Sequence, residues 1–173
     1  MLITIDNILD EARLQTIHKL LNKARFVDGK LSAGMAAKRV KNNQEVAQDD
    51  EHLQQLNNIV MGSLVSNPTY QSAVLPLKIA TPFYARYGSG MTYGDHVDDP
   101  VMGPMQQRYR SDVSTTVFLN NPDDYDGGEL VINTSFGQQR LKLPAGQAVI
   151  YPSSSLHHVA EVSKGERIVA VTW

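Results

Sequence analysis

The chain has 173 residues, a formal net charge of −2 and no cysteine. These numbers suit one domain. They exclude disulfides, thiolate metal sites and cysteine nucleophiles, and they give no reason to expect electrostatic capture of nucleic acid. The opening MLITIDNILD has no basic segment before an apolar run, as a signal peptide would, and no apolar stretch is long enough to cross a membrane. We therefore expect a soluble, cytoplasmic protein with no nucleic-acid or membrane partner.

Residues 1–76 predict an N-terminal helical support segment that begins with a short strand over Leu2–Ile5. Two apolar stripes at helical spacing follow, and Asn67-Pro68 ends the second because the residue before proline avoids the α region. The stripes are Leu14, Ile17, Leu21 and Ala24, and then Leu53, Leu56, Val60 and Leu64. Between them VDGKLSAG predicts a loop, whereas KNNQEV is polar and ambiguous.

Residues 77–173 predict a β-rich core. Short apolar runs alternate with turn formers such as Asp126-Gly127-Gly128, a pattern typical of a sandwich or barrel. The runs are LKIATPFYARY, VSTTVFLN, GELVIN, QQRLKLP, QAVIYP, HHVAEV and RIVAVTW. The expected fold class is mainly β with flanking helices, and the two parts are expected to form one compact unit.

His96 and Asp98 stand two residues apart after a glycine-containing stretch. In a strand, residues at this spacing point to the same face, so the pair predicts two ligands of a metal site. The third ligand is expected from the adjacent His157 and His158, of which strand alternation admits only one to the interior. Two imidazoles and one carboxylate leave three positions open on an octahedral metal, the arrangement of non-haem Fe(II) oxygenases. His18 and His52 have no partner motif.

Arg167 follows His157 by ten residues, beyond the Lys164-Gly165 turn. Its guanidinium can bind a carboxylate through two parallel hydrogen bonds. We expect it on a strand beside the histidine strand, where it would hold the far carboxylate of a keto acid that chelates the iron. The alternative is a solvated charge at a sheet edge.

Several strings carry a resemblance that covers nearly the whole chain. RSDVSTTVFLNNPDDYDGGELVI, LPAGQAVIYPSSSLHHV, GERIVAVTW and, in the first half, VDGKLSAG and VKNNQEV resemble the bacterial PKHD-type hydroxylases. That group is linked to iron uptake and belongs to the prolyl-hydroxylase-like branch of the Fe(II)- and 2-oxoglutarate-dependent dioxygenases. The resemblance implies a double-stranded β-helix, or jelly roll, flanked by helices. The related enzymes usually continue beyond the position of Trp173 with a helical segment that this sequence does not include.

The resemblance also implies roles for individual residues. His96, Asp98 and His157 match the iron ligands, Arg167 matches the arginine that binds 2-oxoglutarate, and Tyr87 matches a tyrosine near the co-substrate. For Tyr87 the alternative is a core tyrosine. Residues 98–112 form a polar loop after the first ligands, either a lid over the substrate or an ordinary exposed loop.

The expected function is hydroxylation with Fe(2+), 2-oxoglutarate and O2, which yields succinate and CO2. Ascorbate as a reductant is implied by the resemblance alone. Two other functions use the same ligands: a non-catalytic jelly-roll sensor that binds metal and 2-oxoglutarate, and a zinc hydrolase. The substrate, whether a small molecule, a peptide or a protein, stays open. So does the oligomeric state, with a homodimer as one alternative.

Overall fold

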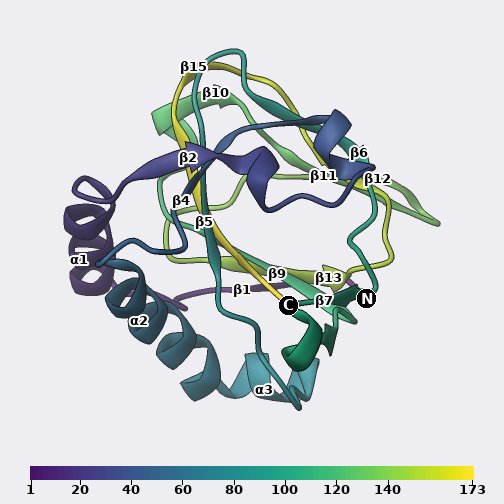
Figure 1. The fold of residues 1–173 in the computed structure, drawn as a ribbon, viewed down its shortest axis with the longest axis horizontal. Helices are drawn as coiled ribbons and strands as arrows, with labels where there is room; N and C mark the ends of the chain where they lie inside the picture. Colours follow the sequence, from purple (N-terminus) through teal and green to yellow (C-terminus); the bar gives the residue numbers. More distant parts are fainter.

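Two facing antiparallel sheets form the body of the protein in the computed structural model, which describes all residues 1–173 (Figure 1). The larger sheet contains, in spatial order, β1 (Ile3–Ile5), β13 (Ala148–Pro152), β9 (Val113–Phe118), β16 (Arg167–Thr172), β5 (Phe83–Tyr87), β4 (Gln44–Val46) and β2 (Phe26–Asp28). The smaller contains β12 (Gly137–Leu141), β11 (Leu130–Thr134), β14 (His157–Val159), β6 (Thr92–His96) and β3 (Lys41–Asn42). The predicted mainly β class is confirmed.

Two short antiparallel pairs lie outside these sheets. One joins β10 (Tyr125–Gly127) to β15 (Val162–Gly165), and the other joins β7 (Val101–Met102) to β8 (Tyr109–Arg110). The second pair lies within residues 98–112, so this stretch is an ordered hairpin and not a structureless loop.

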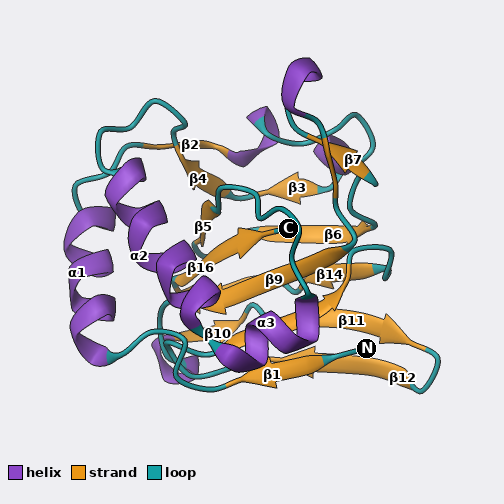
Figure 2. Cartoon of the chain, turned by 90° about the horizontal axis from the view of Figure 1, so that it is seen from below, coloured by secondary structure: helices purple, strands orange, loops and turns teal.

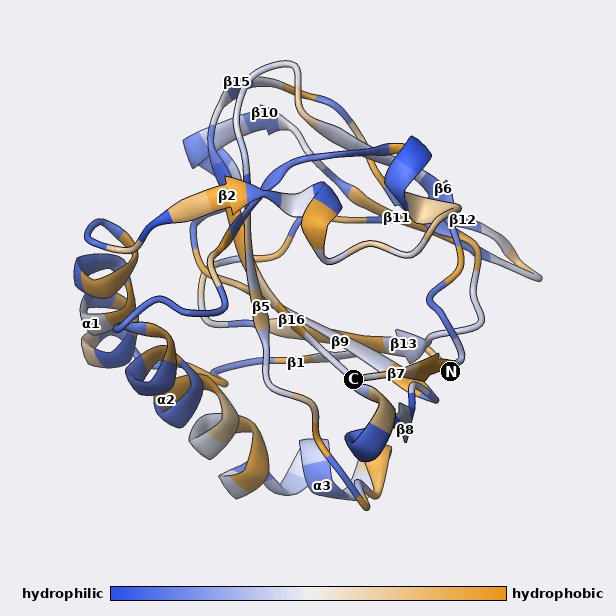
Figure 3. Ribbon diagram, in the orientation of Figure 1, coloured by the Kyte–Doolittle hydropathy of each residue, from blue (hydrophilic) through white to orange (hydrophobic).

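Three helices cover one face of the larger sheet (Figure 2). They are α1 (Glu11–Leu21), α2 (Leu53–Ser66) and α3 (Pro68–Val74). The predicted apolar stripes of α1 and α2 are confirmed, since Ile17 and Leu56 are fully buried in one core with Tyr84 of β5. Both helices carry apolar as well as polar residues, as expected of helices that cover a sheet (Figure 3). None of the helices has the length and apolar character needed to span a lipid bilayer.

The unpredicted helix α3 begins at the same Asn67-Pro68 that ends α2. Asn67 caps it, because its side-chain oxygen accepts a hydrogen bond from the Tyr70 N–H at 3.0 Å. Proline is favoured at the first helical position, where no N–H is needed. The same dipeptide therefore stops one helix and starts the next.

The first 76 residues also contribute strands to both sheets. The ambiguous KNNQEV forms β3 and β4, which pair with β6 of the smaller sheet and β5 of the larger sheet. The segment Lys41–Val46 therefore crosses from one sheet to the other. The loop predicted over residues 27–34 begins with the last two residues of β2 and continues in a short 3-10 helix, Gly29–Leu31.

Candidate metal and co-substrate site

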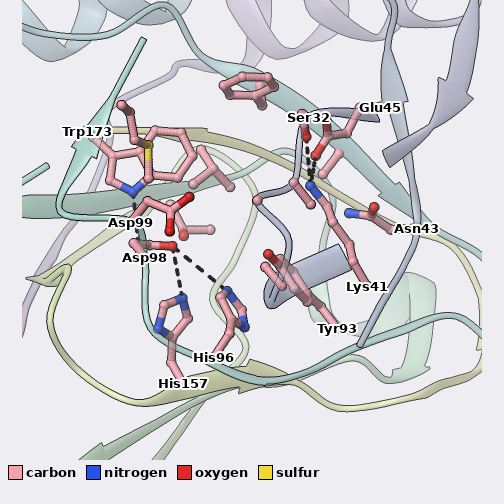
Figure 4. A pocket seen from close by; sticks show the side chains of 18 of the residues that line it. Ser32, Lys41, Asn43, Glu45, Tyr93, His96, Asp98, Asp99, His157 and Trp173 are labelled. Atoms are coloured by element: carbon pink, nitrogen blue, oxygen red, sulfur yellow. Dashed lines mark hydrogen bonds and ion pairs between the residues drawn. The ribbon is translucent and has the colours of Figure 1, made fainter. Parts of the chain in front are cut away.

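Three candidate metal ligands meet between the sheets (Figure 4). β6 and β14 are neighbours in the smaller sheet, and their register sets His96 directly opposite His157. The Oδ1 atom of Asp98 lies 3.9 Å from Nε2 of His96 and 3.8 Å from Nε2 of His157. One ligand atom from each residue lies within 4.8 Å of the others, close enough to share one ion.

Both imidazoles direct a nitrogen lone pair toward the position that a shared metal ion would occupy. Nδ1 of His96 bonds to the Gly94 carbonyl at 2.8 Å, and Nδ1 of His157 bonds to the Ser155 carbonyl at 2.9 Å. A carbonyl only accepts, so each Nδ1 carries the proton and each Nε2 is free to bind a metal. Burial, helped by the nearby His157, lowers the pKa of His96 to about 4, so this ligand is neutral at pH 7.

Asp98 reaches the site in a different way from the one predicted. β6 ends at His96, so strand alternation does not orient this carboxylate. Its Oδ2 atom instead accepts hydrogen bonds from Ser114 Oγ at 2.6 Å and Trp173 Nε1 at 2.8 Å, which leaves Oδ1 facing the imidazoles. No local pattern predicted these two donors, because they lie 16 and 75 residues away along the chain.

The prediction that only one of the adjacent histidines faces inward is confirmed. His157 is 4% exposed, whereas the ring of His158 turns away and bonds to Asp95 Oδ1 at 2.7 Å. His18 lies on α1, and His52 bonds to Asp50 just before α2. Neither is part of the cluster.

Arg167 lies in the opposite sheet from the histidines. The expectation that its strand runs beside the histidine strand is wrong, because β16 pairs with β5 and β9 and not with β14. The expectation of a charge at a sheet edge also fails, since Arg167 is only 1% exposed. Its register partner is Tyr87, whose ring centroid lies 5.1 Å from the guanidinium carbon.

The Arg167 guanidinium has no carboxylate partner within the protein. Its Nε and Nη1 atoms are buried without any hydrogen bond. A buried charge without a partner is costly, by several kcal/mol. This group therefore fits an anionic ligand, and a carboxylate matches its planar fork. Burial raises the pKa of the neighbouring Tyr87 to about 12, so its hydroxyl stays protonated and can donate a hydrogen bond.

One cavity of about 860 Å³ connects all these groups. Its lining includes the three candidate ligands, Arg167 and Tyr87. The hairpin in residues 98–112 forms another part of its wall through residues such as Met102 and Tyr109. The donor set fits Fe(II), and the unpaired arginine in the same cavity fits the distal end of a dicarboxylate.

Comparison with known proteins agrees with this chemistry. Residues 82–173 match the family model of the 2OG-Fe(II) oxygenase superfamily. A PKHD-type hydroxylase of Thioalkalivibrio sulfidiphilus is 56% identical over 96% of this chain and 75% of its own length. Another, of Thermosynechococcus vestitus, is 46% identical over 100% of this chain and 77% of its own length.

Solved structures with a similar fold include two prolyl hydroxylases. The enzyme of Trichoplax adhaerens, in complex with a hypoxia inducible factor peptide fragment, has a TM-score of 0.73 at 18% identity, over 99% of this chain and 82% of its own. The prolyl-4-hydroxylase of Pseudomonas putida has a TM-score of 0.65 at 18% identity, over 99% of this chain and 90% of its own. These likenesses confirm the jelly-roll fold. The chain belongs to the 2OG-Fe(II) oxygenase superfamily and, within it, to the PKHD-type hydroxylases.

Proposed function

We propose that this Fe(II)- and 2-oxoglutarate-dependent dioxygenase binds its iron through His96, Asp98 and His157 and holds the C5 carboxylate of 2-oxoglutarate with Arg167. The observation that carries the proposal is the buried guanidinium without a counter-ion in the same cavity as the three ligands. Iron, 2-oxoglutarate and O2 together supply the oxidising power that hydroxylates a substrate C–H bond, with succinate and CO2 as co-products.

The protein's own residues position and shield these groups. Tyr93 stacks on His96 with ring centroids 3.7 Å apart and nearly parallel planes, which fixes the imidazole plane. Tyr151 packs edge-on against His157 at 5.1 Å. Tyr87 lies beside Arg167, where its hydroxyl can donate a hydrogen bond to a carboxylate held by the guanidinium. Apolar side chains such as Val159 complete the lining and reduce the access of water.

The two alternative functions are less favoured for different reasons. A zinc hydrolase would leave the charge of the buried Arg167 without a partner. A sensor that binds metal and 2-oxoglutarate would use the same residues as the dioxygenase, so family membership decides between these two. Membership of the hydroxylase family favours catalysis over sensing.

The fold itself leaves the substrate class open. The Trichoplax structure contains a peptide, whereas HygX of Streptomyces hygroscopicus, with a TM-score of 0.63 at 11% identity, contains hygromycin B. We further propose a cytoplasmic location, because the co-substrate is a metabolite of the cell interior, and we propose ascorbate as an accessory reductant. Cell fractionation and the dependence of turnover on added ascorbate test these two points.

The test of the site is an anaerobic titration of the apoprotein with Fe(II) and then 2-oxoglutarate. Chelation of the iron by the keto acid gives a weak visible charge-transfer band. We expect this band in the wild type, no band in His96→Ala and a band only at much higher 2-oxoglutarate concentration in Arg167→Met. Tight metal binding without any band would overturn the assignment of the keto-acid site.

A further inference from the structure

Three polar side chains face the cavity from the segment that crosses between the sheets. Lys41, Asn43 and Glu45 alternate along this segment, as residues on one face of an extended chain do, and all line the cavity. The intervening Asn42 and Gln44 point away, since they bond to the Gly90 carbonyl and to Arg86. We call Lys41, Asn43 and Glu45 the polar wall.

The charged members of the polar wall form a buried ion pair. Nζ of Lys41 lies 2.5 Å from Oε1 of Glu45 and also donates to Ser32 Oγ at 2.9 Å (Figure 4). Both side chains are less than a tenth exposed. A buried pair is a poor source of stability, because desolvation offsets most of the attraction. Its place on a cavity wall therefore suggests that it serves a ligand.

The middle member of the polar wall has unused hydrogen-bonding groups. Asn43 is 4% exposed, and neither Nδ2 nor Oδ1 has a hydrogen-bond partner. The amide lies close enough to the Tyr87 hydroxyl to act on the pKa of that hydroxyl in the lowering direction, but the two groups form no hydrogen bond of normal geometry. Leaving such groups buried and unpaired is unfavourable, so a partner from outside the chain would fit here.

The charges of the iron and of 2-oxoglutarate require neither charged member of the polar wall. These charges, together with those of Asp98 and Arg167, cancel. The polar wall is also neutral overall, with a positive and a negative group side by side. A singly charged ligand would satisfy one of these groups and be repelled by the other. A ligand that carries both an anionic and a cationic group satisfies the two together.

We propose that the polar wall binds the substrate to be hydroxylated and that this substrate is a free α-amino acid. Its carboxylate would accept hydrogen bonds from Lys41 and Asn43, and its ammonium group would donate to Glu45. This proposal rests on the function proposed above, which supplies the oxidising centre.

The cavity has the size and spacing that this arrangement needs. Cavities of roughly 300–1,000 Å³ hold drug-sized ligands, so about 860 Å³ leaves room for a small molecule beside the co-substrate. Nζ of Lys41 lies 5.2 Å from the Tyr93 ring centroid, and that ring lies 3.7 Å from the His96 ring, so the two distances together place the ammonium within about 9 Å of this ligand. An amino acid held at its α-carbon can thus extend its side chain toward the metal.

The same residues also have a structural role, and the test must separate the two. Lys41 bonds to Ser32 in the preceding segment, which also lines the cavity and closely approaches the Asp99 carboxylate at Gly34. A purely structural pair would affect folding or general access to the cavity. It would not distinguish a free amino acid from the same amino acid with one charge removed.

The experiment measures succinate formation by the iron-loaded enzyme with 2-oxoglutarate and each of the proteinogenic L-amino acids, followed by mass spectrometry of the product. We expect at least one amino acid to stimulate turnover and gain one oxygen atom. Its N-acetyl and its amide forms should each lose roughly ten- to a hundredfold in kcat/KM, the effect of one lost hydrogen bond to a charged group.

Three variants locate the effect on the chain. Lys41→Met/Glu45→Leu removes both charges and leaves none unpaired, so it should fold but no longer distinguish free from capped amino acids. Asn43→Ala should weaken the substrate about tenfold without lowering the melting temperature, because the amide has no partner to lose. The matched control is Lys38→Met, at an exposed lysine of the preceding segment. It should change neither the preference for free over capped amino acids nor the melting temperature.

The outcomes are separable. A wild-type protein that gives the Fe(II)–2-oxoglutarate band but responds to no free amino acid, or responds equally to capped forms and peptides, overturns the polar-wall proposal alone. A protein without the band overturns the proposed function. In that case equilibrium dialysis of the same amino acids against the wild type and the double variant still decides whether the polar wall binds them.

Discussion

Replacing Trp173 with phenylalanine should weaken metal binding although the indole touches no metal position. Trp173 Nε1 donates to Oδ2 of Asp98 at 2.8 Å, and Ser114 supplies the second hydrogen bond to the same oxygen. These bonds turn the other oxygen toward the two imidazoles. In Trp173→Phe the aromatic ring still packs against Phe83, whose centroid lies 5.8 Å away, but the N–H is lost.

The size of the effect follows from the type of bond removed. A hydrogen bond to a charged group contributes about 1.5–3 kcal/mol, and about 1.4 kcal/mol corresponds to a tenfold change in affinity. Loss of an outer partner of a metal ligand typically lowers affinity about 10–100-fold. Both estimates predict a 10–100-fold weaker affinity for Fe(II) in Trp173→Phe, and a similar loss in Ser114→Ala.

Anaerobic competition titration with Fe(II), or with Co(II) as an air-stable probe, measures this affinity directly. Phe83→Leu is the control, because it disturbs the packing of the indole and leaves its N–H in place. It should change metal affinity by less than Trp173→Phe does. If Trp173→Phe binds metal within about twofold of the wild type while His96→Ala does not bind, the Trp173 hydrogen bond does not orient Asp98 for metal binding.

Further predictions concern the other groups of the site. His157→Ala should abolish metal binding and His158→Ala should preserve it, as isothermal titration would show; the reverse result would exchange their roles. Arg167→Met should weaken 2-oxoglutarate binding by about 2–5 kcal/mol, the usual effect of removing one member of a buried charge pair. Without co-substrate the same variant should not melt at a lower temperature than the wild type, and a clear drop would mean that the arginine has a partner within the fold. Gly128→Ala should lower the free energy of unfolding by more than about 1 kcal/mol, because φ there is +67° and a Cβ would lie 3.1 Å from Cδ of Arg167. Gly137→Ala is the control for backbone strain alone, because φ there is +101° and no atom lies near the added Cβ. An equal loss of unfolding free energy at Gly137 would show that contacts with the Cβ contribute nothing at Gly128.

The sequence predicted those parts of the molecule that depend on local patterns. The apolar stripes of α1 and α2 and the alternation that separates His157 from His158 are set by neighbours along the chain, and the structure agrees with both. The segment KNNQEV stayed ambiguous because its strands are short and polar. It is extended because its two strands pair with β6 and β5, which come later in the chain, and a local sequence pattern cannot predict such pairing.

Long-range placement was beyond the same patterns. The spacing of His96 and Asp98 was correctly associated with one cluster, but for the wrong geometric reason, since the strand ends before Asp98. The position of Arg167 opposite the histidines depends on which sheet accepts β16, which the ten-residue interval does not determine. Ser114 and Trp173 could not be connected to Asp98 at all, because only the closed fold brings them together.

The walls of the cavity come from two different parts of the chain. The candidate iron ligands and the arginine come from β6, β14, β16 and the residues just after β6, all within the part of the chain that matches the superfamily. The polar wall comes from Lys41–Val46, before that part begins. The candidate metal site is thus built within the matched part of the chain, whereas the polar wall is built by a segment outside it. On this division, replacing residues 41–46 with the corresponding segment of a superfamily member outside the PKHD-type hydroxylases should change which substrate stimulates succinate formation and leave the affinity for Fe(II) within about twofold. A large loss of metal binding in the exchanged protein would show that the segment is part of the oxidising centre after all.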